Sequence, residues 1–158
     1  MAEHGLDAVN VTDITEAADV GVGSFYNHFA SKDALYEAVL ADAFEAFGTE
    51  LDRLVEQEAD PAVRISACIR RTVARASADA LWGRMLIRES FSPTATRTGL
   101  APRLKRDIDD GVTTGRLHLH DPTLSFVMVG TGVIGSISAC LSAQQRATRD
   151  TADWPERT

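Results

Sequence analysis

Apolar residues recur at three- and four-residue spacing along most of the chain, and no long stretch alternates apolar and polar residues. The first spacing is the period of an α-helix that buries one face, whereas alternation would indicate a half-buried strand. Leu100, Leu104, Ile108 and Val112 recur every four residues until Gly115 ends the pattern. The sequence therefore predicts an all-α protein.

Two short helices joined by a tight turn are expected near the N-terminus. Asn10 and Asp13 can form a capping box at the start of the first helix. Asp19 and Gly21 mark the turn, because Asp tolerates the left-handed conformation and Gly can cap the next helix. The second helix, residues 22–29, has Val22, Phe25 and Phe29 on one side and Ser24, Asn27 and His28 on the other. This pattern fits a helix-turn-helix, but small helical bundles contain similar pairs.

Longer helices are expected in the rest of the chain. Ser31 caps a helix from Lys32 to about Glu58, and Asp60 caps another that begins at Pro61. Further helices are expected from about residue 79 to 91 and from 100 to 115, whereas residues 92–96 are predicted as a loop and 116–121 as a connection. The predicted buried line of the first of these helices is Leu35, Val39, Leu40, Phe44, Phe47, Leu51, Leu54 and Val55.

No charged residue occurs from Pro122 to Gln145. A membrane span has to be considered for such a segment, but it lacks flanking aromatic belts and contains several serine and threonine residues. A helix that is apolar on nearly all sides is otherwise buried inside protein, so we expect a buried or dimer-forming helix and no membrane contact. Small residues let two helices approach closely, and the expected dimer contact is Gly132, Gly135, Ser136 and Ala139.

Composition and charge narrow the class of protein. The 158 residues carry a net charge of -7 and ordinary amounts of Gly and Pro, and the two cysteines, Cys68 and Cys140, favour buried packing over a disulfide framework or catalysis. No secretory signal is visible, so a cytoplasmic protein is expected. Residues 1–58 hold two Lys or Arg against thirteen Asp or Glu, which argues against DNA binding on electrostatic grounds alone.

The stretch 11–35 nevertheless resembles the DNA-binding domain of the TetR family of transcriptional repressors. Gly23-Ser24-Phe25-Tyr26-Asn27-His28-Phe29, followed by Ser31-Lys32, matches the recognition helix of that family and the start of its next helix. The likeness covers about residues 2–45, and beyond it only the helical layout matches. It implies a helix-turn-helix DNA-binding domain at 1–45, a helical-bundle ligand-binding and dimerisation domain at 46–158, and no enzyme activity, cofactor or metal.

The resemblance also implies roles for individual residues. Gly23 and Ser24 would approach base edges, Tyr26 and His28 would hydrogen-bond phosphates, and Lys32 would meet the DNA backbone at a helix N-terminus. Asp19 stands where the family usually has a turn Gly, and Gly21 where it usually has a Ser or Thr cap; both are sterically acceptable. The full expected DNA-contacting set is Asn10, Thr12, Val22, Gly23, Ser24, Tyr26, Asn27, His28 and Lys32.

The two ends of the chain depart from the family pattern. Met1–Gly5 resembles the last turn of a helix that packs over the helix-turn-helix, and Thr151–Thr158 resembles the cap and opening turn of a further dimerisation helix. We therefore expect the natural protein to continue at both ends, with the preceding part supplying positive charge.

The resulting interpretation is a ligand-responsive repressor that acts as a homodimer and is released from a palindromic operator by a small-molecule effector. Large polarizable side chains suit an apolar pocket, and Arg71 or Glu89 would add a polar anchor. For each of these residues ordinary core packing is the alternative. The expected apolar lining is Trp82, Met85, Phe91 and Phe126.

Two other functions stay open at this point. A helical small-molecule-binding protein without DNA binding would fit the acidic N-terminal third. A metal-dependent enzyme would be built on His118 and His120, although a solvated loop in which Asp121 caps the next helix is favoured there.

Overall fold

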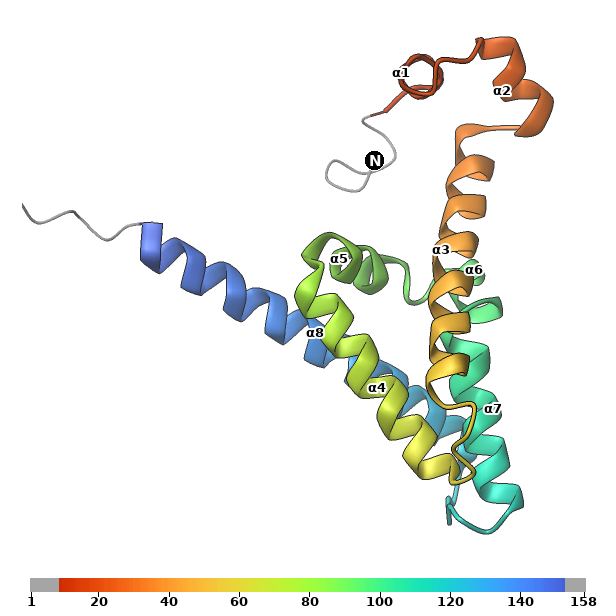
Figure 1. Cartoon of the computed structure of the whole chain (residues 1–158), viewed down its shortest axis with the longest axis vertical. Coiled ribbons are helices and arrows are strands. Elements are labelled where there is room, and N and C mark those ends of the chain that lie inside the picture. The colour runs from red at the N-terminus through yellow and green to blue at the C-terminus, as the bar shows by residue number, and fades with distance from the viewer. Residues whose placement is uncertain (1–8, 153–158) are drawn as a thin grey trace, which may run out of the picture.

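The structure, a computed structural model, describes residues 9–152 and the side chains of residues 9–147. This part of the chain forms eight helices and no strand, so the predicted all-α fold is confirmed for it (Figure 1). The helices are α1 (Val11–Ala17), α2 (Val22–His28), α3 (Lys32–Leu54), α4 (Pro61–Ala78), α5 (Ala80–Glu89), α6 (Pro93–Arg97), α7 (Leu100–Thr113) and α8 (Pro122–Ala152).

Helices α1 and α2 sit at one end of α3, and α4 to α8 gather around its other end (Figure 1). We call α1 and α2 the head and α4 to α8 the body; α3 joins them, and the domain boundary expected at residue 45 falls inside it. The predicted capping box is present, because Asn10 Oδ1 accepts from Asp13 N at 2.8 Å and Asp13 Oδ2 accepts from Asn10 N at 2.9 Å. Asp19 has a φ of 54°, the left-handed turn expected of it.

The hydrophobic core lies between the lower part of α3 and the body. The predicted buried line of α3 is largely confirmed, but Val39 and Leu54 are both 54% exposed. Val39 lies about 100° around the helix from Leu40, and Leu54 is the last residue of α3. The core cluster consists of Leu40, Phe44, Phe47, Leu51, Ala76, Trp82, Leu86, Ala95, Ile137 and Leu141.

One short helix and the end of α3 differ from the prediction. Residues 93–97 form α6 instead of a loop, with Ser92 Oγ accepting from Ala95 N at 3.1 Å and Pro93 at the first helical position. Such a short helix has no room for a hydrophobic period, so only its cap reveals it. Helix α3 ends at Leu54 and not near Glu58.

Helix α8 runs seven residues beyond Gln145, through the position where Thr151 was expected to cap another helix. Residues 145–152 contain neither Gly nor Pro, so nothing in them stops the helix. The segments Met1–Gly5 and 153–158, for which helical turns were expected, lie outside the described residues.

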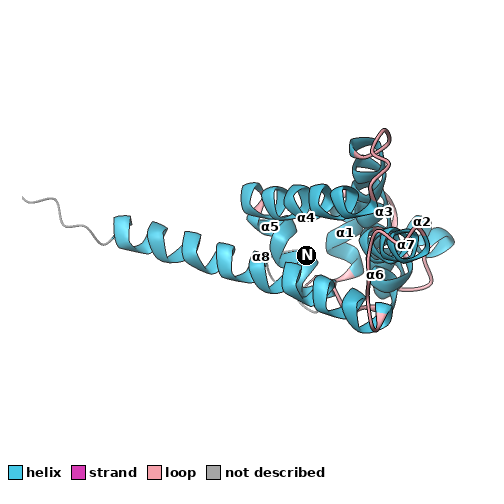
Figure 2. Cartoon of the chain, turned by 90° about the horizontal axis from the view of Figure 1, so that it is seen from below, coloured by secondary structure: helices cyan, strands magenta, loops and turns pink. Residues whose placement is uncertain are grey.

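Helix α8 packs on the other helices of the body along one narrow line, and its C-terminal part extends away from them (Figure 2). Its segment Pro122–Ala147 is long and apolar enough to cross a membrane by length and composition, and only 11% of its most apolar window is buried. Of the two alternatives expected for this helix, burial is wrong for the chain alone, since only Ile137 and Leu141 of the described α8 side chains are buried, and dimer formation stays a prediction. The exposed face carries Leu124, Val127, Met128 and all four expected dimer residues, Gly132, Gly135, Ser136 and Ala139.

Candidate nucleic-acid interface and cavity

Helix α2 turns one side into the head and the other to solvent. Phe25 is 6% exposed and its ring meets those of Tyr26 and Phe29 at centroid distances of 5.2 and 5.8 Å. The Tyr26 side chain is 56% exposed. The α2 members of the expected DNA-contacting set are all exposed, including Val22, which was predicted on the apolar side with Phe25 and is 42% exposed. These residues are Val22, Gly23, Ser24, Tyr26, Asn27 and His28.

The start of α1 lies in the same head and offers fewer polar atoms. Asn10 uses its Oδ1 atom in the capping box, which leaves its amide NH₂ group for an outside partner. Thr12 is exposed, and its carbonyl accepts from the hydroxyl of the buried Thr15 at 3.0 Å. The α1 contribution to binding is therefore a hydroxyl and an amide donor.

Lys32 has a structural contact that the sequence did not indicate. Its Nζ donates to the carbonyl of Val9 at 2.8 Å, which ties the start of α3 to the segment before α1. The described head also carries Asp13, Glu16 and Asp19. Contacts from this surface to phosphates would therefore come mainly from neutral donors, namely hydroxyls and the N–H groups at helix starts.

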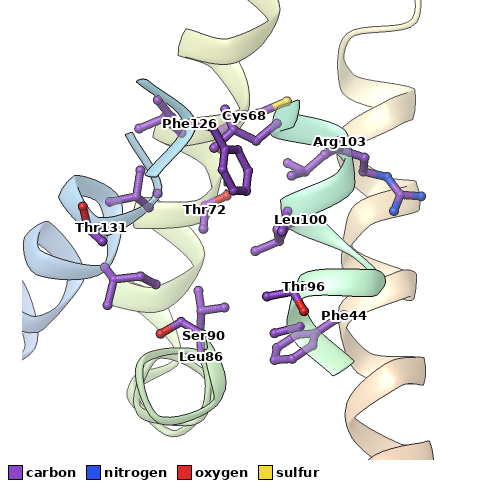
Figure 3. Close-up of a pocket in the computed structure, with 18 of the residues that line it drawn as sticks. Phe44, Cys68, Thr72, Leu86, Ser90, Thr96, Leu100, Arg103, Phe126 and Thr131 are labelled. Carbon is purple, nitrogen blue, oxygen red and sulfur yellow. Dashed lines mark hydrogen bonds between the residues drawn. The ribbon is translucent and has the colours of Figure 1, made fainter. Parts of the chain in front are cut away.

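A cavity of about 320 Å³ lies between α3 and the body (Figure 3). This volume is at the lower end of the range for small-molecule sites, and six helices contribute to the wall. Figure 3 shows Phe126 of α8 projecting between the helices. The apolar lining is Phe44, Leu51, Ile65, Ile69, Leu86, Phe91, Leu100, Leu104, Phe126, Val127, Val133 and Ile134.

Five hydroxyl groups line the cavity, and each donates its proton to a backbone carbonyl of its own helix or turn. Thr72 donates to Cys68 O at 2.8 Å and Thr131 to Val127 O at 2.7 Å. The same holds for Ser90, Thr96 and Thr98. Their oxygens keep lone pairs, so toward a ligand these groups act first as hydrogen-bond acceptors.

Two charged residues, Arg103 and Asp107, line the cavity one helical turn apart on α7. Asp107 is 2% exposed and pairs with Arg64, whose Nε lies 3.2 Å from Asp107 Oδ1. Arg103 points toward α3 and binds two carboxylates there (Figure 3). Hydrogen bonds from the Arg103 guanidinium and from Gly99 N–H lower the pKa of Glu45 to about 2.

Burial, together with the nearby Asp107 carboxylate, raises the pKa of the Cys68 thiol. Cys68 lines the cavity but is therefore a protonated, weakly nucleophilic group at neutral pH. The site offers apolar contact area and acceptors, without an activated nucleophile among these lining residues.

The expected pocket residues divide into two groups. Phe91 and Phe126 line the cavity, and Phe91 is 73% exposed. The other four do not line it. Arg71 donates from Nε to Glu50 at 2.7 Å, and Glu89 accepts from the Tyr36 hydroxyl at 2.7 Å. The Trp82 ring packs on the Phe47 ring with centroids 4.9 Å apart. Met85 packs against the hydrophobic core.

Sequence reasoning missed Arg103, Asp107 and the lining hydroxyls. The sequence holds only one signal for the two charged residues. Arg103 comes directly before Leu104 and Asp107 directly before Ile108, so both lie at the edge of the apolar face of this helix. His118 and His120 are exposed, and Asp121 caps α8 by accepting from Leu124 N at 2.9 Å. No group of three or more metal-ligating side chains occurs within the described residues.

Two family models match the chain. Residues 1–39 match bacterial regulatory proteins of the tetR family, and residues 60–158 match the tetracyclin repressor-like C-terminal domain. The second match alone covers more than half of the chain. The chain belongs to the TetR family.

Curated relatives from this family match about two fifths of the chain. The HTH-type transcriptional repressor DhaR of Mycobacterium sp. (strain GP1) is 42% identical over 62 residues, which are 39% of this chain and 31% of DhaR. The HTH-type transcriptional repressor KstR2 of Mycobacterium tuberculosis (strain CDC 1551 / Oshkosh) is 34% identical over 65 residues, which are 41% of this chain and 32% of KstR2. In these alignments the chain spans about a third of the length of each repressor.

Solved TetR-like structures match nearly the whole chain. RolR without ligand has a TM-score of 0.68 at 32% identity and covers 98% of this chain and 91% of RolR. RolR in complex with resorcinol has a TM-score of 0.70 at 36% identity, and the alignment covers 90% of this chain and 73% of the RolR chain. The fatty acid degradation regulator FadR from Bacillus halodurans has a TM-score of 0.67 at 17% identity, and the alignment covers 90% of this chain and 84% of the FadR chain. At this identity the match supports the fold alone.

Proposed function

We propose that this chain is a ligand-responsive transcriptional repressor, which binds a palindromic DNA operator as a homodimer and releases it when a small molecule occupies the cavity. The main supporting observation is that one continuous helix, α3, follows the polar surface of α2 at its start and contributes Phe44 and Leu51 to the cavity wall in its second half. Curated relatives that match about two fifths of the chain are named as repressors. The proposal places the protein in the cytoplasm and involves no catalysis or cofactor.

The DNA contacts in this proposal follow the open surface of the head. Helix α2 enters the major groove, where Gly23 and Ser24 approach base edges and Val22 and Asn27 flank them. Tyr26 and His28 hydrogen-bond phosphates, and Asn10, Thr12 and Lys32 add contacts from the starts of α1 and α3.

Selection from a pool of random double-stranded DNA tests this part. A two-fold symmetric dimer has to enrich a sequence with two inverted half-sites. If no sequence is enriched while the protein still binds small molecules, it is a helical ligand-binding protein without DNA binding, as its acidic head would favour.

The dimer is proposed to form along the exposed face of α8. Leu124 and Met128 are 54% and 65% exposed there, and an apolar face of this length is a liability unless it is covered. Gly135→Arg places a charge at its centre and is expected to give monomers in light scattering. Val63→Arg, on α4, replaces an apolar residue that is 41% exposed and serves as the matched control. A dimer unchanged by Gly135→Arg would place the interface elsewhere.

The effector is proposed to be an uncharged molecule of about one aromatic ring with hydrogen-bond donors. The cavity is small and mainly apolar, its hydroxyl groups present acceptors, and Arg103 is already paired with carboxylates. RolR, which this chain resembles in structure, has been solved with resorcinol. Resorcinol is a ring with two such donors.

Calorimetry with three ring compounds tests the effector class. Resorcinol is expected to bind about thirtyfold more tightly than 1,3-dimethoxybenzene, which keeps the ring and loses both donors, because each of the two lost hydrogen bonds contributes about 1 kcal/mol. Benzoate carries a negative charge and is expected to bind more weakly than resorcinol. Equal affinities, or a preference for benzoate, would contradict the assignment.

A further inference from the structure

The contact between α3 and α7 is centred on the guanidinium group of Arg103. Its Nε donates to Asp52 Oδ2 at 2.7 Å, while Nη1 and Nη2 donate to the two carboxylate oxygens of Glu45 at 3.0 and 2.7 Å. Nη1 also donates to the carbonyl of Gly99 at 2.8 Å. One side chain of the body thus holds two carboxylates that lie two helical turns apart on α3.

A glycine on α3 makes room for this guanidinium. Gly48 is buried between Glu45 and Asp52 in the sequence, and a Cβ atom built on it would lie 2.6 Å from Arg103 Cζ and 2.9 Å from Arg103 Nε. Any larger residue therefore pushes the guanidinium off α3. We call Gly48 and its two flanking carboxylates the Arg103 seat.

The corner between α6 and α7 lies directly on α3 beside the seat. Gly99, at φ 71°, donates its N–H to Glu45 Oε2 at 3.1 Å. A Cβ atom on Gly99 would lie 2.6 Å from Phe44 Cβ and 2.8 Å from Phe44 O. The corner therefore touches the backbone of the helix that carries the head.

The same corner forms part of the cavity wall. Thr98, Leu100, Ala101 and Arg103 line the cavity on one side of the corner, and Phe44 lines it from α3. By contrast, Arg71 and Arg75, which pair with Glu50 of α3, do not line the cavity. A molecule in the cavity thus contacts the very residue that holds α3.

We propose that Arg103 is the positioning residue that transmits occupancy of the cavity to the head. A ligand that fills the cavity displaces the α6–α7 corner, the guanidinium shifts in the Arg103 seat, and α3 changes its angle to the body together with α1 and α2. The ligand achieves this only because its contacts differ between the two angles of α3. This inference rests on the proposed function, since it explains how a ligand would alter DNA binding.

The angle of α3 can be measured without DNA or a natural effector. Spin labels at Asn27→Cys on α2 and Lys105→Cys on α7, two exposed positions, report the distance between head and body. Cys68 and Cys140 are replaced by alanine, and labelled protein is diluted into unlabelled protein so that only distances within one chain are measured. Ala101→Phe, or the smaller Ala101→Leu if the first does not fold, fills the cavity in place of a ligand.

Filling the cavity is expected to shift the label distance by about 2 Å or more in the otherwise unchanged chain. In Gly48→Ala, which displaces Arg103 without removing a charge, filling the cavity is expected to cause no further shift. Gly21→Ala is the matched control, because it adds the same methyl group at the start of α2, where no atom lies within 4 Å, and it should respond like the parent.

Two results would overturn the inference: no shift on filling the cavity of the parent, or the same shift in Gly48→Ala as in the parent. Circular dichroism melts of each variant show that it is folded. Failure of the proposed function would appear instead as a lack of DNA or resorcinol binding, which the distance measurement does not use.

Discussion

The head and the body of this TetR-family protein hold their candidate functional residues in opposite positions. In the head the polar residues of α2 face solvent and the buried side is a few residues such as Phe25 and Thr15. In the body the candidate site is enclosed by six helices, and its polar groups are already bonded to the protein itself. A surface that reads DNA needs exposed donors, whereas a cavity for a small apolar molecule needs shape and few unpaired polar groups.

The comparison also indicates where stability is concentrated. The core cluster lies around the body and the lower part of α3, and none of its members belongs to α1 or α2. The head should therefore unfold locally at a lower free energy than the body. The predictions below separate the two regions.

The largest effect is expected from Phe25→Ala. Removing a buried phenylalanine lowers the free energy of unfolding by about 3–5 kcal/mol. A head of two short helices should not stay folded after such a loss, whereas the body does not depend on this ring. Hydrogen exchange should become fast in residues 11–28 and stay slow in α4 and α7. Val20→Ala, at a position 47% exposed in the turn, is the control. Cooperative loss of protection in the whole molecule would contradict a separately stable body.

A smaller loss, located in the body, is expected from Gly99→Ala. Both Gly99 and Gly115 have a φ of 71°, but only at Gly99 would an added Cβ meet another helix. Backbone strain alone should cost Gly115→Ala about 1 kcal/mol. At Gly99 the clash with Phe44, together with the greater strain of a ψ of -116°, should raise the cost to about 3 kcal/mol. Thermal unfolding of both variants measures the difference. Equal losses would show that the corner does not press on α3.

Tyr26→Phe should weaken DNA binding without affecting folding. The exposed hydroxyl contributes about 1 kcal/mol if it donates to a phosphate, and its loss should lower affinity for all DNA sequences alike. Asn27→Ala, at the base-facing side, should change the preferred sequence instead. Fluorescence anisotropy with the selected duplex and a scrambled one distinguishes these results. A change of preference in Tyr26→Phe would reassign the hydroxyl to base recognition.

The smallest effect concerns the pH dependence of the link between α3 and the body. The pKa of Glu45 is lowered from 4.5 to about 2 by Arg103 and Gly99 N–H, so the stabilisation is complete above pH 4.5 and is lost as the pH falls toward 2. Because the Glu45 side chain is 53% exposed, solvent screening limits this contribution to about 1 kcal/mol or less. Glu45→Gln should flatten the stability curve in this pH range, and Glu56→Gln, at an exposed position, should not. If Glu45→Gln and the parent protein lost stability over the same acidic pH range, the proposed link between α3 and the body through Glu45 would be contradicted.

The sequence was sufficient for the parts of the molecule that local chemistry determines. The capping box of Asn10 and the cap at Asp60 depend on neighbours within one turn, and they are present as predicted. The predicted apolar side of α2 is only partly confirmed, because Phe25 is buried but Val22 is 42% exposed. Helix α6 escaped prediction because its five residues are too few to show a period.

The cavity could not be located in the same way. Its wall combines α3 with residues up to 134, and large apolar side chains such as Trp82 and Phe126 look alike in the sequence although only Phe126 lines it. The Arg103 seat depends on the absence of a side chain at Gly48, more than fifty residues away. Such contacts between distant segments leave no periodic signal.

The central claim is that the cavity in the body controls DNA binding by the head. The most direct test is the affinity of the protein for its selected operator duplex, measured by fluorescence anisotropy at rising resorcinol concentrations, with 1,3-dimethoxybenzene as the matched control. Saturating resorcinol is expected to raise the Kd for the operator at least about tenfold, equivalent to 1.4 kcal/mol of coupling, whereas the control compound should change it little. An operator Kd that stays constant while calorimetry shows resorcinol bound would contradict the claim.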